Sequence, residues 1–268
     1  MQNIKTKKDQ IESICAKGYQ LDFGTVFESA FENYKKIALY AGLMLLVFSI
    51  LIATVLMSGA ISYIGIENFE EFGNKMKELS TLKVMPLDIA IPLNAGLIVF
   101  SAFISPFMAG FLKMADRGEK GEEFQVSNMF SFYKFPYFFN IFFSVILIGL
   151  ISTSIAMLLE SVGLSFVGTV TTMLISFLTF LTIPLIVFAN LNAAQAIKYS
   201  ILLVSKQPLV LLGLVIVAAI GSFIGILGLC IGIFFTYPFV YSMNYVIYKS
   251  IIGFDEKSEI DEISGTEN

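Results

Sequence analysis

Long uninterrupted apolar blocks constrain the fold of this sequence more than any other feature. The first block, residues 37–61, contains no charged side chain. A helix needs about 20 apolar residues to cross the roughly 30 Å hydrocarbon core of a bilayer. Five further blocks approach or exceed that length, at residues 89–112, 138–159, 164–189, 208–226 and 229–248. We therefore expect an all-α polytopic membrane protein with six transmembrane helices.

The composition agrees with this class. Of the 268 residues, 56 % are hydrophobic and only 14 % are charged, which is too few charges to cover the surface of a soluble domain. The blocks divide the chain into a polar cytoplasmic amino-terminal segment (1–20), a six-span domain (21–253) and an acidic cytoplasmic tail (254–268). Because the amino-terminal segment is polar, we expect no cleavable signal peptide, and the first span is its own insertion signal.

The basic residues predict the orientation. All but three of the 17 Lys and Arg residues fall in segments on one side of the predicted spans, and the exceptions, Lys75, Lys77 and Lys83, lie in the 62–88 loop. Cytoplasmic segments carry such an excess of basic residues, so both termini are expected in the cytoplasm. Lysine-rich, arginine-poor usage is typical of a low-GC bacterium, which gives a bacterial cytoplasmic (inner) membrane as the predicted location. Residues 67–83 are expected to form a solvated helix in the outer loop.

A weaker pattern divides the chain into three similar units. Each odd-numbered span is preceded by a short segment with helical apolar spacing, at residues 25–36, 127–135 and 192–207. Thr25 and Glu28 fit a capping box for the first segment, and Ser127 is the expected cap of the second. We expect amphipathic helices in the cytoplasmic membrane interface, each followed by a helical hairpin. Soluble helices packed on the cytoplasmic ends of the spans are the alternative.

Each even-numbered block also carries a proline shortly after a hydroxyl residue. The three prolines are Pro106, Pro184 and Pro238. Proline lacks an amide proton and crowds the carbonyl four residues earlier, here the carbonyls of Ala102, Phe180 and Phe234. Such carbonyls must find partners inside the protein, often a Ser or Thr hydroxyl. We expect three kinks arranged about a common centre.

The last block adds a polar stripe beside its proline. Tyr237, Tyr241 and Tyr245 are four residues apart and share a helix face, with Asn244 adjoining it. With the three prolines, these side chains are the candidates to line a cavity, and the hydroxyls of Tyr237 and Tyr241 are candidate partners for the carbonyl freed by Pro238. Ordinary interhelical hydrogen bonding in a packed bundle is the alternative.

Residues that carry chemistry are scarce. There is no histidine, the commonest general base and metal ligand. The two cysteines, Cys15 and Cys230, have neither metal-ligand spacing nor a disulfide framework. The predicted spans hold no ionisable side chain at depth, where such groups usually mark proton or substrate paths. We therefore predict no catalytic, cofactor-binding or metal-binding residue, and no nucleic-acid partner.

Three stretches resemble a known family. They are VFESAFENYKKIALYAGLMLLVF at 26–48, AAQAIKYSILLVSKQPLVLLGLVIV at 193–217 and GLCIGIFFTYPFVYSMNYVIYKSIIG at 228–253. They resemble the membrane domain that accompanies some bacterial glycerophosphoryl diester phosphodiesterases, and its stand-alone, uncharacterised six-span relatives. The resemblance implies six spans and no established activity, because the hydrolase is a separate soluble domain that uses histidine. Similar proteins labelled as carotene oxygenases would need iron held by histidines, which this chain lacks.

Two functions fit these observations. The first is a non-enzymatic membrane protein that organises membrane lipids or other membrane proteins, in an oligomeric state that the sequence does not give. The alternative is a transporter or channel for a neutral or lipidic solute, with a path between the proline-kinked even-numbered helices. An intramembrane enzyme is the least favoured. A hydrated cavity between the kinks would separate the first two.

Overall fold

The structure is a computed structural model that describes residues 7–82, 85–227 and 231–253, and within these residues every regular element is helical. The elements are α1 (Lys7–Lys17), α2 (Phe23–Ile64), η1 (Ile66–Asn68), α3 (Phe69–Thr81), α4 (Leu87–Lys120), η2 (Val126–Tyr133), α5 (Tyr137–Ser161), α6 (Ser165–Thr179), α7 (Thr182–Ala189), α8 (Ala193–Val204), α9 (Pro208–Phe223), η3 (Ile224–Leu227), α10 (Gly232–Thr236) and α11 (Pro238–Ile252).

Five helical segments of the described chain are long and apolar enough to cross a membrane. They are α2, α4, α5, α6 continued by α7, and α9 continued by η3. This confirms the prediction of a multi-pass helical membrane protein. The sixth predicted span, 229–248, is not among them. Its described part consists of the short helices α10 and α11, which are separated at Tyr237, and residues 228–230 lie outside the described part.

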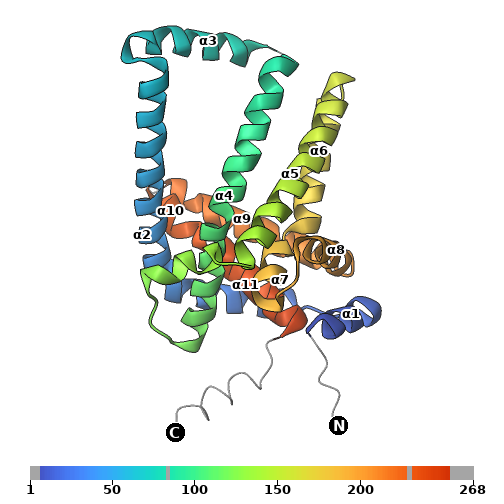
Figure 1. Ribbon diagram of the computed structural model, residues 1–268. Helices are drawn as coiled ribbons and strands as arrows, with labels where there is room; N and C mark the ends of the chain where they lie inside the picture. The colour runs from blue at the N-terminus through green and yellow to red at the C-terminus, as the bar shows by residue number, and fades with distance from the viewer. Residues whose placement is uncertain (1–6, 83–84, 228–230, 254–268) are drawn as a thin grey trace.

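The long helices stand on a base of shorter ones (Figure 1). In that view α2 and α4 rise from the base and α3 joins their upper ends, while α5 and α6 form a second hairpin beside them. The helices α1, α7, α8 and α11 lie in the base. A helix predicted at 67–83 is confirmed over most of its length, because α3 covers Phe69–Thr81, while residue 83 lies outside the described residues.

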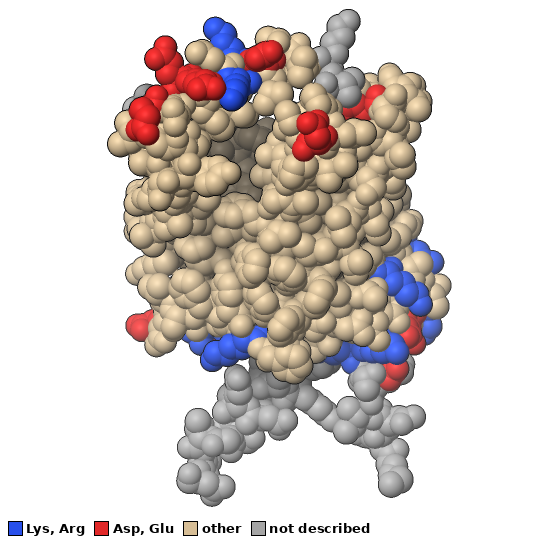
Figure 2. Space-filling view, turned by 45° about the horizontal axis from the view of Figure 1, so that its top comes forward, with Lys and Arg blue, Asp and Glu red and all other residues tan. Residues whose placement is uncertain are grey.

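The buried core lies toward the base. The last buried residue of α2 is Leu45, and farther along the helix Val55 is 69 % exposed. In α4 most of the buried side chains lie between Pro106 and Ala115, while Leu97 above them is 55 % exposed. On the face drawn in Figure 2, charged side chains gather at the top and at the base, and the belt between them is uncharged. Exposed apolar side chains over such a belt are what contact with lipid requires.

The first amphipathic segment is continuous with the first span. Helix α2 has 42 residues, which at 1.5 Å each extend about 63 Å, roughly twice the hydrocarbon thickness. Figure 1 shows its first turns lying across the base before the helix turns upward. The predicted Thr25–Glu28 capping box is wrong: Asp22 is the cap, and its Oδ1 accepts hydrogen bonds from the Thr25 amide and hydroxyl, each 2.7 Å long.

The other two segments differ in structure. The second is the 3-10 helix η2, whose N-terminal flanking residue is Gln125, so Ser127 is not its cap. It lies so close to α4 that a Cβ atom on Gly110 would come within 2.8 Å of the Met129 backbone. The third is α8, which begins with a full capping box between Asn192 and Gln195.

The polar amino-terminal segment contains a helix that the sequence reasoning did not predict. In α1 the side chain of Ile11 is completely buried. Gln10 Nε2 donates to the Ile252 carbonyl at 2.7 Å, and Lys7 Nζ donates to the Phe188 carbonyl at 3.2 Å. Helix α1 therefore docks on the base and joins the two ends of the described chain.

Candidate functional site

The three predicted kink residues are buried, but the helices respond to them differently. Pro106 lies inside α4, which continues past it. Pro184 lies in α7, just beyond the break that separates α6 from α7. Pro238 is the first residue of α11, directly after the break from α10. The helix is therefore interrupted near two of the three prolines.

Side-chain hydroxyls bind backbone carbonyls beside all three prolines. Tyr133 donates to the carbonyl of Phe103 at 2.9 Å, and Tyr34 donates to that of Phe235 at 3.1 Å. Each acceptor lies three residues before its proline, one residue beyond the carbonyl that the sequence predicted. The hydroxyls therefore bind carbonyls next to the predicted ones, and no side-chain hydrogen bond to the Ala102 or Phe234 carbonyl is found among the described residues.

Near Pro184 the hydroxyl that binds a backbone carbonyl belongs to a serine, Ser200. Ser200 Oγ donates to the carbonyl of Leu178 at 2.9 Å and accepts from the amide of Leu181 at 3.2 Å. These two backbone groups flank the break between α6 and α7, and Ser200 is completely buried. One hydroxyl thus satisfies both a carbonyl and an amide that the interrupted helix leaves without helical partners.

The hydroxyls that precede the prolines in sequence have other partners. Ser105 Oγ donates back to the Ser101 carbonyl at 2.7 Å, and Thr236 Oγ1 donates to the Ser222 carbonyl of α9 at 2.6 Å. The Thr182 hydroxyl is buried and has no hydrogen bond among the described residues. Sequence proximity therefore did not identify the groups that bind the kink carbonyls.

The three donors follow a cyclic order. Tyr133 belongs to η2 and reaches α4, and Ser200 belongs to α8 and reaches the α6–α7 break. Tyr34 belongs to the first turns of α2 and reaches α10, near the end of the chain. Each of the three amphipathic segments therefore binds the proline-bearing helix that precedes it, and the first segment binds the last such helix.

The predicted tyrosine stripe is divided between two environments. Tyr237 is 37 % exposed, and its ring lies edge-on to that of Tyr241 at 5.8 Å. The Tyr241 ring packs against Phe111 at 5.3 Å, and Asn244 is half-buried with no side-chain hydrogen bond within the described ranges. Only Tyr245 extends into a polar site. Tyr34 of α2 binds the Phe235 carbonyl, and among the described residues neither Tyr237 nor Tyr241 donates to the predicted Phe234 carbonyl.

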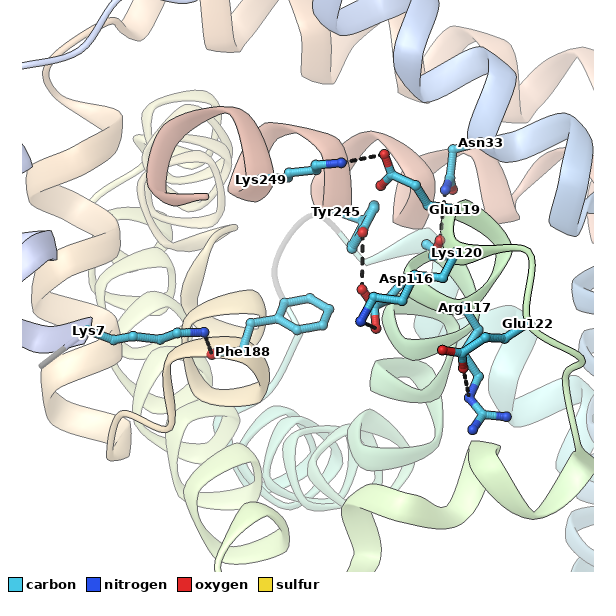
Figure 3. A network of polar contacts seen from close by, with 11 residues as sticks. Lys7, Asn33, Asp116, Arg117, Glu119, Lys120, Glu122, Phe188, Tyr245 and Lys249 are labelled. Atoms are coloured by element: carbon cyan, nitrogen blue, oxygen red, sulfur yellow. Dashed lines mark hydrogen bonds and ion pairs between the residues drawn. The ribbon is translucent and has the colours of Figure 1, made fainter. Parts of the chain in front are cut away.

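Tyr245 belongs to a set of polar residues that we name the basal polar network, namely Asn33, Asp116, Glu119, Tyr245 and Lys249 (Figure 3). Tyr245 donates to Asp116 Oδ1 at 3.1 Å, and Lys249 forms an ion pair with Glu119. Asn33 Nδ2 donates to the Ala115 carbonyl at 2.7 Å. The network therefore joins α2, α4 and α11 at the base.

Sequence reasoning missed the acidic half of this network. The second span was predicted to end at residue 112, but α4 continues to Lys120 and ends at Gly121, which has a left-handed backbone. The two extra turns place Asp116 and Glu119 three residues apart on one face. Gly121 directly after a Lys is a known helix-end signal and could have revealed this continuation.

The two carboxylates of the basal polar network are paired with basic side chains. Lys120 lies 3.6 Å from Asp116, so a basic side chain lies beside each of the two carboxylates. The Lys249 and Glu119 side chains remain 43 % and 34 % exposed, and pairs as exposed as this contribute about 1 kcal/mol or less. In the part of the chain that the structure describes, no cluster of three or more His, Cys, Asp or Glu could hold a metal ion.

The contact between α1 and α8 includes a tyrosine whose pKa is raised. Tyr199 of α8 donates to Glu12 Oε1 at 2.6 Å, and this hydrogen bond, with burial, raises the pKa of Tyr199 to about 12. Burial also raises the pKa of the Cys15 thiol, which keeps it protonated and a poor nucleophile. Cys230 lies outside the described residues.

No protein-family model, curated protein or solved structure matches this chain. Its function is therefore argued from the contacts described above. The resemblance in residues 26–48, 193–217 and 228–253 remains an expectation.

Proposed function

We propose that this chain is a non-enzymatic, six-span protein of the bacterial inner membrane that organises membrane lipids. In this proposal the domain is made of three pseudo-repeats, each an amphipathic segment followed by a hairpin, and α10 with α11 forms the sixth span. The observation that carries the proposal is the cyclic order of the hydrogen bonds from Tyr34, Tyr133 and Ser200. Three equivalent units around one centre would produce such an order.

The distribution of charge supports the orientation with both termini in the cytoplasm. Among the described basic residues, only Lys75 and Lys77 belong to α3 at the top of Figure 1. The others lie toward the opposite end, in α1, in the base portions of α2 and α4, in α8, in α11 and in the loops of the base. An excess of basic residues at one end is typical of the cytoplasmic face.

Packing at the kinks favours a scaffold over a carrier. Phe107, Leu185 and Met243 come from the three proline-bearing helices, and none is more than 2 % exposed. They belong to one continuous apolar core. This packing supports a scaffold, and the exposed apolar side chains in the upper halves of α2 and α4 provide surface for lipid.

The test is to purify the full chain in a mild detergent, identify the lipids that remain bound, and then measure solute flux in liposomes. We expect phospholipids to co-purify and flux of neutral solutes to stay at the level of protein-free liposomes. Flux well above that level would contradict the scaffold role. If no lipid stayed bound during gentle extraction, the proposed lipid-organising role would be contradicted.

A carrier for a neutral or lipidic solute remains the second candidate because of one cavity. It has a volume of about 430 Å³, lies between the outer halves of α4 and α5, and is lined on its polar side by Asn94, Thr153 and Ser154. If the chain is a carrier, Asn94→Leu should reduce the flux measured above. A flux that Asn94→Leu leaves unchanged would exclude this cavity from the path.

A further inference from the structure

A cavity at the base lies beside a close contact between α2 and α4. A Cβ atom on Gly118 would lie 2.6 Å from Ile37 Cγ2, so the two helices touch at this point. Beside the contact is a cavity of about 370 Å³. Its apolar lining includes Ile37 and Met114, and its polar lining is Lys36, Glu122 and Glu123.

The cavity lies at the edge of the uncharged belt. Lys36 directly precedes the apolar block 37–61, and Glu122 directly follows the loop residue Gly121, where α4 has ended. Polar headgroups of phospholipids occupy this level of a membrane, between the hydrocarbon core and water. The cavity is therefore at headgroup depth, on the side with the excess of basic residues.

Of the charged groups that line the cavity, only some form ion pairs with other described residues. Lys35 bonds to Glu32 at 2.5 Å, whereas Lys36 forms no ion pair with any described residue. Glu122 is paired with Arg117 Nε at 3.3 Å. The Glu123 carboxylate has no ion pair in the described part of the chain, since Arg117 binds only its backbone carbonyl. One cation and one carboxylate thus line the same cavity without internal partners.

An exposed apolar stripe leads away from Lys36 along α2. Tyr40, Leu43, Val47 and Ile50 follow Lys36 at steps of four and three residues, so all five share one helix face. These four side chains are 59 %, 42 %, 55 % and 57 % exposed. We name these four residues the α2 stripe. It extends from headgroup depth into the uncharged belt, as an acyl chain does.

We propose that this cavity binds a phospholipid whose headgroup carries a primary ammonium group. Lys36 binds the phosphate, Glu123 and Glu122 receive the ammonium, and an acyl chain lies along the α2 stripe. A headgroup with only a negative charge would place no partner opposite the two carboxylates. A quaternary ammonium group has no N–H to donate to them. The inference rests on the proposed lipid-organising function and names the lipid class.

The test uses the full chain, delipidated in detergent, and native mass spectrometry with one added phospholipid at a time. The three probes share the same acyl chains and carry an ethanolamine, a choline or a glycerol headgroup. We expect the ethanolamine lipid to bind about fivefold or more better than the choline lipid, because charge-assisted hydrogen bonds are lost with the N–H groups.

Charge-neutralising variants locate the site. Lys36→Gln and Glu123→Gln should each lower ethanolamine-lipid binding about fivefold. The matched controls are Lys35→Gln and Glu28→Gln, which change the same charges on exposed side chains of α2 outside the cavity. All four positions are exposed to solvent, and unchanged thermal unfolding of each variant shows that it is folded.

The outcomes distinguish this inference from the proposed function. Equal binding of all three lipids, or binding that Lys36→Gln and Glu123→Gln leave unchanged, overturns the headgroup site and leaves a lipid-organising role standing. Preference for the glycerol lipid with an effect of Lys36→Gln alone also overturns it, because the site then recognises negative charge only. Binding of no lipid at all overturns both proposals.

Discussion

Three hydroxyl groups, on Tyr34, Tyr133 and Ser200, each bind a backbone carbonyl that lies three to six residues before one of the prolines. In water such a carbonyl would bind solvent, so the hydroxyl would contribute little. In a membrane the alternative partner is absent, and the side chain becomes the only source of that hydrogen bond. At the residue scale the protein therefore depends on a few hydroxyls more than on its charges.

Tyr34→Phe tests this dependence directly. The substitution keeps the ring, which packs edge-on to Phe239 at 5.4 Å, and removes only the bond to the Phe235 carbonyl. We expect the free energy of unfolding in mild detergent to fall by about 1 kcal/mol. Tyr63→Phe is the matched control, because Tyr63 is 93 % exposed and should show no change. Equal stability of the two variants would contradict the role given to Tyr34.

The raised pKa of Tyr199 predicts that the stability of the fold decreases at alkaline pH. Its pKa is raised in the folded protein to about 12, mainly by the hydrogen bond to Glu12, while an unfolded chain has the ordinary value of about 10. A raised pKa of this kind stabilises the fold fully below pH ~10, and the contribution is lost as pH rises toward ~12.

The measurement is the difference in thermal unfolding midpoint between wild type and Tyr199→Phe. The difference should be largest near pH 8 and should shrink by about pH 11, as the unfolded tyrosine ionises first. Tyr63→Phe again supplies the control for the other titrating groups. A difference that stays constant between these pH values would show that the Glu12 contact does not hold the proton.

At the residue scale, the sequence predicts features that depend on neighbouring residues but not contacts between residues far apart in the chain. The prolines, and the need of nearby carbonyls for partners, could be read locally, because proline acts on its own helix. The donors could not, since Tyr34 and Phe235 are 201 residues apart and nothing in either local pattern names the other. Asp116 and Glu119 were missed for a different reason, because the apolar block ended before the helix did.

Among the elements, η3 and α10 make a close contact that involves the backbone. A Cβ atom on Gly225 would lie 2.4 Å from the carbonyl carbon of Gly232 and 2.3 Å from Thr236 Oγ1. Backbone atoms cannot move away from such an approach as a flexible side chain can. The absence of a side chain at Gly225 and Gly232 therefore permits the two segments to approach this closely.

Gly225→Ala should destabilise the protein by roughly 1–3 kcal/mol, because the added methyl group has no space at the crossing. Gly59→Ala is the matched control: nothing lies within 4 Å of its Cβ position, and alanine is the better helix former. We expect Gly59→Ala to be neutral or slightly stabilising. Unfolding measurements in detergent that rank the two variants in the opposite order would exclude the close crossing.

At the element scale, too, the features set by local sequence were predicted and those set by distant contacts were not. The long helices α4 and α5 follow from their apolar blocks. The union of segment 25–36 with the first span was not predicted, because its lysines suggested a separate helix at the interface. Docking of α1 was missed because only Ile11 among its residues is fully buried, and one buried residue makes no pattern.

At the scale of the whole molecule, the charge asymmetry predicts the orientation. In a background with Cys15 and Cys230 replaced by alanine, Glu70→Cys in α3 and Ser205→Cys at the base each supply one exposed thiol. We expect a membrane-impermeant thiol reagent to label Glu70→Cys in spheroplasts and Ser205→Cys only in inverted vesicles. Labelling in the opposite pattern would reverse the proposed topology.

The hydrogen bond between Tyr34 and Phe235 has a consequence for the order of events during biosynthesis. Chains leave the ribosome amino terminus first, so the segment with Tyr34 is made long before its acceptor. Gln10 and Ile252 are separated even further, by 242 residues. Until residue 235 has been synthesised, Tyr34 lacks its acceptor. Both contacts therefore form only after the last helices have been synthesised, and a chain that stops before residue 235 can form neither.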